Sequence, residues 1–289
     1  ACLGQALQEN QKEIPTWRGH HEQNMALTGI AYSRAKRRKQ IFVATSSVGP
    51  GSTNMVTAAA VAMSNRIPIL FLPGDTFSSR LPDPVLQQVE HFNNPGTTAN
   101  DAFKPVTRYF DRITRPEQII SSLQQAVQVM LDPADCGPAC ISLSQDVQGE
   151  VYDYPEDFFK ERIHTIRRSR PDDFQIKEAA DLIKKSKKPI IISGGGVFYS
   201  DATEELSAFA QKHNIPVTQT VMGYSTMKKD HSHYLGVIGG LGGKAANNLS
   251  KETDTAIAIG TKLADFTTGS WANFENPDFK LVSINAARF

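Results

Sequence analysis

The sequence contains few cysteines, no excess of charge of either sign and no long apolar run. Its three cysteines (Cys2, Cys136 and Cys140) have a spacing that fits neither a zinc site nor a redox pair, so we expect buried thiols in a reducing cytoplasm. The 31 basic and 30 acidic residues nearly cancel, which argues against nucleic acid or an anionic membrane as a partner. No apolar run approaches the ~20 residues of a membrane span, so we expect a soluble protein.

The seven histidines form no set that is spaced for metal binding. His20 and His21 are adjacent, whereas His231 and His233 lie in a loop-like stretch. We therefore expect no metal site within this sequence.

Short apolar runs alternate with helix-period segments along the whole chain. Predicted strands cover residues 41–45, 67–72, 137–143, 188–193, 215–219, 255–260 and 281–285. Predicted helices cover residues 22–35, 55–63, 115–130, 176–183 and 203–213. This alternation predicts an α/β fold with two doubly wound parallel-sheet domains. We place the first domain at residues 1–150, a linker at 151–171 and the second domain at 172–289.

A glycine-proline turn follows the first of these strands. Gly49-Pro50-Gly51 lets the backbone approach a ligand closely, and strand, turn and helix N-terminus together can form a cradle at the carboxyl end of a parallel strand. The alternative is a tight connection in which Thr53 or Asn54 caps the next helix. Glu22, in the first turn of the preceding helix, has the corresponding alternative of an exposed acid that favours the helix dipole.

Three elements together resemble a known family: His-Glu-Gln-x-Met-Ala at residues 21–26, a strand ending in Thr-Ser, and Gly-Pro-Gly-x-Thr-Asn at residues 49–54. They resemble the pyrimidine-binding domain of thiamine diphosphate enzymes of the acetolactate synthase type. The resemblance implies that Glu22 is catalytic: it would hydrogen-bond N1′ of the cofactor's aminopyrimidine and so promote formation of the ylide at thiazolium C2. It also implies that Gly49, Pro50, Gly51 and Asn54 line the pyrimidine.

The second half resembles the Rossmann-like central domain of the same superfamily, including the Gly-x-x-Leu-x-Asp pattern at residues 260–265. Gly194-Gly195-Gly196 follows a predicted strand, as a dinucleotide cradle would. Its spacing differs from Gly-x-Gly-x-x-Gly, which favours a domain without a bound nucleotide over one with it.

Segments 82–88, 100–106, 109–118 and 144–150 look like the trihydroxycyclohexanedione hydrolases of bacterial myo-inositol breakdown. This resemblance implies hydrolytic opening of a trihydroxylated cyclohexane-1,2-dione to a 5-deoxy-uronic acid through the thiamine ylide. Two alternatives stay open: an acetolactate synthase-like carboligase of 2-oxoacids, and a non-catalytic chain that keeps only the fold. Gln88, Lys104 and Arg108 lie in or beside a long polar segment and are candidates for substrate contact, with plain surface exposure as the alternative.

The sequence departs from the family in one respect, because it contains no Gly-Asp-Gly motif. In the family that motif belongs to a third domain, which holds the diphosphate through Mg²⁺. We therefore expect a piece of a longer enzyme, with a partly truncated first domain and no diphosphate-binding domain, that is inactive alone. The resemblance implies thiamine diphosphate and Mg²⁺ as cofactors, and a homodimer or homotetramer with the active site between subunits.

Overall fold

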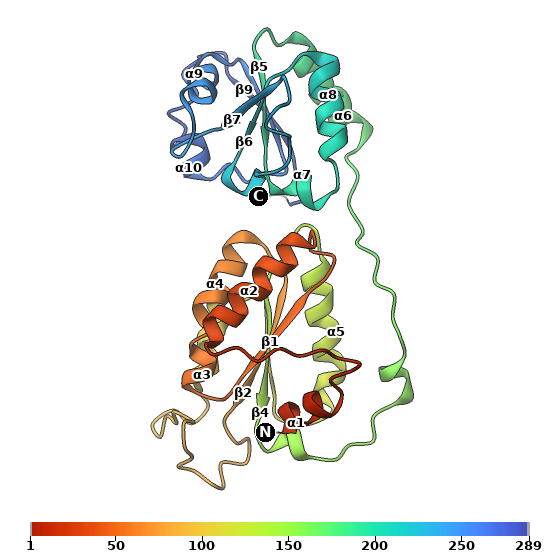
Figure 1. Cartoon of the computed structure of the whole chain (residues 1–289), viewed down its shortest axis with the longest axis vertical. Coiled ribbons are helices and arrows are strands. Elements are labelled where there is room, and N and C mark those ends of the chain that lie inside the picture. Colours follow the sequence, from red (N-terminus) through yellow and green to blue (C-terminus); the bar gives the residue numbers. More distant parts are fainter. Residues whose placement is uncertain (1, 288–289) are drawn as a thin grey trace. The chain divides into compact units, whose positions relative to one another are not determined.

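The computed structural model describes residues 2–287 and divides the chain into two compact units, Ala1–Arg167 and Arg168–Phe289. Each unit contains one sheet in which all strand pairs are parallel, and helices lie on both faces of each sheet (Figure 1). The predicted α/β class with two doubly wound domains is therefore confirmed. The boundary between the units falls within residues 151–171, and the finer domain limits stay a prediction.

The first unit has the strand order β1-β2-β4-β3. Its strands are β1 (Phe42–Ser46), β2 (Ile69–Asp75), β3 (Tyr109–Ile113) and β4 (Ala139–Ser144). Its α-helices are α1 (Cys2–Glu9), α2 (Glu22–Ala35), α3 (Pro50–Thr53), α4 (Val56–Asn65) and α5 (Gln118–Leu131). Its 3-10 helices are η1 (Ala99–Val106), η2 (Val147–Gly149) and η3 (Glu156–Phe159).

Apolar packing on both faces holds the first sheet in place. Helices α2 and α4 cover one face and α5 covers the other (Figure 1). On the α5 face, Ala126 and Met130 pack against Leu70 and Ile141 of the central strands. Alanines dominate the buried side of α4, which lets this helix approach closely. The loops at the carboxyl ends of β1 and β2 are thereby held at one edge of the sheet.

The second unit has the strand order β7-β6-β5-β8-β9, the order of a Rossmann-like fold. Its strands are β5 (Pro189–Ser193), β6 (Val217–Gln219), β7 (Tyr234–Val237), β8 (Thr255–Ile259) and β9 (Lys280–Ile284). Its helices are α6 (Asp173–Lys185), α7 (Gly195–Tyr199), α8 (Thr203–His213), η4 (Val221–Gly223), α9 (Lys244–Glu252) and α10 (Asp265–Thr268).

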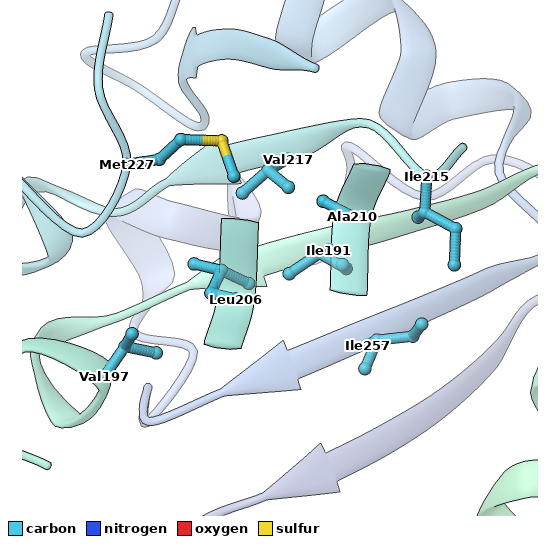
Figure 2. Packing of buried hydrophobic residues seen from close by; sticks show 8 residues of the cluster. All are labelled: Ile191, Val197, Leu206, Ala210, Ile215, Val217, Met227 and Ile257. Carbon is cyan, nitrogen blue, oxygen red and sulfur yellow. The ribbon is translucent and has the colours of Figure 1, made fainter. Parts of the chain in front are cut away.

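The second unit has a core on each face of its sheet. Figure 2 shows Leu206 and Ala210 of α8 packed over Ile191, the middle residue of the central strand β5. The neighbouring residues Ile190 and Ile192 point to the opposite face, where they pack with Ala246 of α9. Every one of these side chains is almost completely buried, as expected for a strand covered on both faces.

The predicted ranges missed the edge strands β3 and β7 and the helices α3, α7, α9 and α10. Strand β3 is an edge strand with the sequence Tyr-Phe-Asp-Arg-Ile, and four of its five residues are only half-buried, so it lacks the apolar run of a central strand. Strand β2 also continues to Asp75 instead of ending at Leu72. Among residues 2–287, no helix combines the length and apolar character needed to cross a bilayer.

Candidate cofactor site at the first sheet

The carboxyl edge of the first sheet brings Glu22 next to the glycine-proline turn. Helix α2 begins at Glu22, and its N-cap is His21, whose Nδ1 accepts a hydrogen bond from the Asn24 backbone N–H at 3.4 Å. The turn follows β1 and continues directly into α3. The start of α2 and the start of α3 are distant in the sequence but lie next to each other in the structure.

The geometry of the turn requires glycine at position 49 and favours it at position 51. Gly49 has φ +70° and ψ −118°, a conformation that residues with a side chain rarely adopt, and a Cβ there would lie 1.8 Å from the backbone oxygen of Gln87. A Cβ on Gly51 would lie 2.4 Å from Ser47 Oγ and 3.3 Å from Glu22 Oε1. Pro50 occupies the first position of α3, where its missing N–H has no consequence.

Asn54 connects the two elements by a side-chain hydrogen bond. Its Nδ2 donates to Glu22 Oε2 at 2.8 Å and lies 3.5 Å from His21 Nε2. The bond from Asn54, followed by the bond from the Glu22 backbone N–H, lowers the pKa of the Glu22 carboxyl. Glu22 is half-buried and ionised at neutral pH, so it offers a fixed hydrogen-bond acceptor at the edge of the turn.

The alternative interpretation of Thr53 and Asn54 as the cap of the next helix is wrong. The residue that precedes α4 is Met55, and no side chain caps this helix. Asn54 instead ends α3, and its amide is directed to Glu22. Glu22 lies in the first turn of α2, as its own alternative describes, and in addition accepts this hydrogen bond from Asn54.

Gln88 is buried within the loop between β2 and η1. Its Oε1 accepts a hydrogen bond from the Phe77 backbone N–H at 2.7 Å, and its Nε2 donates to Asp83 at 2.7 Å and to Glu90 at 3.2 Å. These bonds give Gln88 a structural role in ordering the loop, whose residue Gln87 touches Gly49. A direct contact between Gln88 and substrate stays an untested prediction.

Lys104 lies on η1 and is more than half exposed. Its Nζ lies 2.9 Å from Asp101 Oδ1 and 5.5 Å from the centre of the Phe110 ring. An exposed ion pair of this kind contributes little to stability, and contact with substrate remains an untested prediction for Lys104 as well.

Arg108 lies at the opposite edge of the sheet from Glu22. It comes immediately before β3, and its backbone N–H donates to Pro138 O, just before β4, at 2.8 Å. Its Nη1 lies 3.2 Å from Asp135 Oδ1. The structure therefore brings Glu22, the turn and Asn54 together but does not bring Arg108 to them, and its contact with substrate stays a prediction.

Comparison with known proteins matches both units to one family. Residues 3–94 match the description "Thiamine pyrophosphate enzyme, N-terminal TPP binding domain", and residues 176–288 match "Thiamine pyrophosphate enzyme, central domain". The chain belongs to the thiamine pyrophosphate enzymes. The N-terminal match contains Glu22, the turn and Asn54, which are the residues that the structure brings together.

Curated relatives are similar to almost the whole chain. The chain is 50% identical over 287 residues to proteins named 3D-(3,5/4)-trihydroxycyclohexane-1,2-dione hydrolase from Clostridium tetani and from Clostridium perfringens. It is 48% identical over 287 residues to a protein of the same name, numbered 1, from Bacillus cereus. In each case the match covers 99% of this chain and 45% of the relative, so the chain spans about half the length of the curated relatives it matches.

The second unit, which matches the central-domain model, has a glycine cluster where its strand order reverses. Gly196 N–H donates to Gly260 O at 2.9 Å, and a Cβ on Gly196 would lie 2.6 Å from Gly260 Cα. Gly194 N–H donates to Ile259 O at 2.8 Å. Backbone occupies the space beside these glycines, which gives them a packing role, and a domain without a bound nucleotide stays a prediction.

The sequence patterns did not identify a buried polar cluster beneath the turn. Its members are Ser52, Asp75, Asn100, Arg112 and Ser142. They come from five separate segments, so no local motif contains them. Within residues 2–287, no group of three or more His, Cys, Asp or Glu side chains is arranged to hold a metal ion.

Proposed function

We propose that the whole protein opens the ring of a trihydroxylated cyclohexane-1,2-dione by hydrolytic cleavage of a C–C bond and yields a 5-deoxy-uronic acid. The observation that carries this proposal is the 50% identity over 99% of the chain to hydrolases whose name states that substrate. The activity is proposed for the whole protein because the chain spans 45% of those relatives.

We infer that thiamine diphosphate is the cofactor and that its aminopyrimidine binds between Glu22, Asn54 and the turn Gly49-Pro50-Gly51. The hydrogen-bonding groups fit this ring. The ring has N–H donors and ring nitrogens, and the Glu22 carboxylate and the Asn54 amide can bind such groups in the plane of the ring. Gly51 lies next to Glu22 Oε1 and has no side chain, so a flat ring can pack against its backbone. When bound, this cofactor supplies an electron sink for breaking a bond next to a carbonyl group.

The two oxygens of Glu22 have different roles in this proposal. Oε2 accepts the hydrogen bond from Asn54, which fixes the orientation of the carboxylate. Oε1 lies beside Gly51 and would be the oxygen that holds or releases the proton. A ring bound in the plane of the carboxylate would exclude water from it and raise the pKa of Glu22, which would allow the carboxyl group to hold that proton.

Several further properties of the whole protein belong to the same proposal. Mg²⁺ would join the diphosphate to oxygen ligands outside the part of the relatives that this chain matches. The protein would form a homodimer or homotetramer with the active site between subunits, and it would act in the cytoplasm. Its remaining partner would be the small-molecule substrate.

A parallel assay of the full-length protein tests the reaction. The enzyme with thiamine diphosphate and Mg²⁺ is given either the cyclic trihydroxydiketone or pyruvate. Ring opening without formation of acetolactate supports the proposal. Acetolactate formation with an untouched diketone contradicts it and assigns the chain to a carboligase, whereas no reaction with either compound indicates a different thiamine enzyme or a non-catalytic protein.

A further inference from the structure

A continuous line of buried hydrogen bonds runs beneath the glycine-proline turn. Ser52, in α3, donates its hydroxyl to Asn100 Oδ1. Asn100 Nδ2 donates to Gly74 O at 2.9 Å and to Ser142 Oγ at 2.6 Å. Ser142 then donates to Asp75 Oδ2 at 2.5 Å. All four side chains are at most 1% exposed, so none of these bonds competes with bulk water.

Arg112 binds Asp75, the last residue of this chain of hydrogen bonds. Its Nε donates to Asp75 Oδ2 at 2.7 Å, and its Nη2 donates to Asp101 and to Thr98, both at 2.8 Å. Thr98 and Asp101 form the capping box of η1, and Asn100 lies between them. Arg112 on β3 therefore binds Asp75, the last acceptor of this hydrogen-bond chain, and also η1, the short helix that contains Asn100.

The chemistry of asparagine suits this position. Gly74 O can only accept a hydrogen bond, so the amide nitrogen must face it and the amide oxygen must face Ser52. One side chain thus accepts a bond from α3 and donates two bonds to β2 and β4. A leucine of similar size would make none of these bonds, and an aspartate could not donate.

The consequence for Glu22 follows from the rigidity of α3. This helix has only four residues and is closed by hydrogen bonds from Thr53 N–H to Gly49 O at 2.9 Å and from Asn54 N–H to Pro50 O at 3.1 Å. Ser52 is therefore fixed relative to Asn54, whose amide holds Glu22 at 2.8 Å. A displacement of Ser52 displaces the amide that orients the carboxylate.

We propose that Asn100 is a positioning residue for Glu22, acting through Ser52 and α3 without touching the carboxylate itself. Its importance for catalysis rests on the proposed cofactor role of Glu22. The positioning itself is a property of this chain and can be measured without cofactor or substrate.

The experiment titrates Glu22 by NMR in the 289-residue chain labelled with ¹³C at glutamate carboxyl groups. The signal of Glu22 is assigned by its loss in Glu22→Gln. Asn54→Ala removes the bond to Glu22 directly and gives the reference increase in its pKa. We expect Asn100→Ala to raise the pKa of Glu22 in the same direction, because α3 is released from its support.

Ser122→Ala is the matched control. Ser122 is equally buried in the first unit and accepts a hydrogen bond from the Tyr109 hydroxyl at 3.1 Å, but it lies on α5, across the sheet. We expect this variant to lower the melting temperature without changing the titration of Glu22. If Asn100→Ala lowers the melting temperature but leaves the pKa of Glu22 at its wild-type value, Asn100 is only structural and the proposal is wrong.

Ser52→Ala keeps the proposal testable if Asn100→Ala does not fold. It removes only the bond nearest to α3, and we expect the same direction of change at Glu22; an unchanged titration in the folded variant overturns the proposal. A shifted titration in a protein whose full-length form is inactive with thiamine diphosphate leaves the positioning intact and contradicts only the proposed function.

Discussion

Replacing Arg112 by leucine tests the buried ion pair at the edge of the first sheet. Arg112 Nε lies 2.7 Å from Asp75 Oδ2, and the side chains are 21% and 1% exposed. Burial disfavours the charged guanidinium, but the bonds and charges of Asp75 and Asp101 outweigh it and raise the pKa of Arg112. Without Arg112, Asp75 is a buried charge with no cation beside it, and breaking such a pair costs about 3–5 kcal/mol.

The two tryptophans allow this effect to be assigned to one unit. Trp17 lies in the first unit, where it stacks on Phe42 with ring centres 6.5 Å apart, and Trp271 lies in the second. In a Trp271→Phe background, urea unfolding followed by tryptophan fluorescence reports the first unit. We expect Arg112→Leu to lower its unfolding free energy by about 3–5 kcal/mol. For a unit of this size the melting temperature falls by about 6–20 °C.

Arg115→Leu is the control for loss of an arginine. Arg115 Nε lies 2.8 Å from Glu117 Oε1, at nearly the same distance as in the buried pair, but its side chain is 74% exposed. Loss of such an exposed pair costs about 0–1 kcal/mol. If Arg112→Leu destabilises the first unit no more than Arg115→Leu does, the argument from burial is refuted.

Three further predictions concern the turn, Glu22 and the thiols. Gly49→Ala should destabilise the first unit by about 1–3 kcal/mol, because φ is +70° at this position, whereas Gly96→Ala, with no atom nearer than 3.9 Å to the added methyl group, should change stability by less than about 0.5 kcal/mol in the same urea assay. Because the pKa of Glu22 is lowered in the folded chain, its contribution to stability is present above the pKa of an unfolded glutamate and is lost as pH falls through the folded value. The difference in unfolding free energy between wild type and Glu22→Gln should therefore shrink between about pH 7 and pH 3, and a constant difference would contradict the lowered pKa. Cys136 and Cys140 are buried, but Cys2 is exposed, so the expectation of buried thiols is wrong for Cys2. Burial raises the pKa of Cys136 to about 11, so at pH 8 an aromatic disulfide reagent should modify Cys2 quickly and Cys136 only after denaturation; equal rates would contradict this burial.

The sequence was sufficient to predict most of the fold, because buried parallel strands leave a clear signal. Runs such as Ile190-Ile191-Ile192 are apolar on both sides of the strand, and in the structure all three side chains are 0% exposed. Strand β3 has no such signal, because its position at the sheet edge allows Asp111 and Arg112 within the strand. An edge strand is easier to recognise once its pairing partner is known. The partner of β3 is β4, which follows it in the sequence after helix α5.

The candidate site was predicted to a similar extent. Glu22, the turn and Asn54 belong to two local motifs, and the structure places these motifs in contact. The support beneath them could not be predicted, because Asn100 and Ser142 meet only after the strands pair, and single polar residues in a sequence do not reveal which of them are buried together. The location of Arg108 at the opposite sheet edge from Glu22 could not be predicted either, because it depends on where β3 pairs in the sheet.

Exchange of the C2 proton of bound thiamine diphosphate in the full-length protein tests the role of Glu22 most directly. Wild type and Glu22→Gln are loaded with cofactor and Mg²⁺, mixed with D₂O and quenched in acid, and the remaining C2 proton is measured by NMR. We predict fast exchange in wild type and exchange at least about 100-fold slower in Glu22→Gln, with an unchanged circular dichroism spectrum, because glutamine cannot hold and release the proton. Equal exchange rates in the two proteins would contradict the assignment of Glu22 as the catalytic carboxylate.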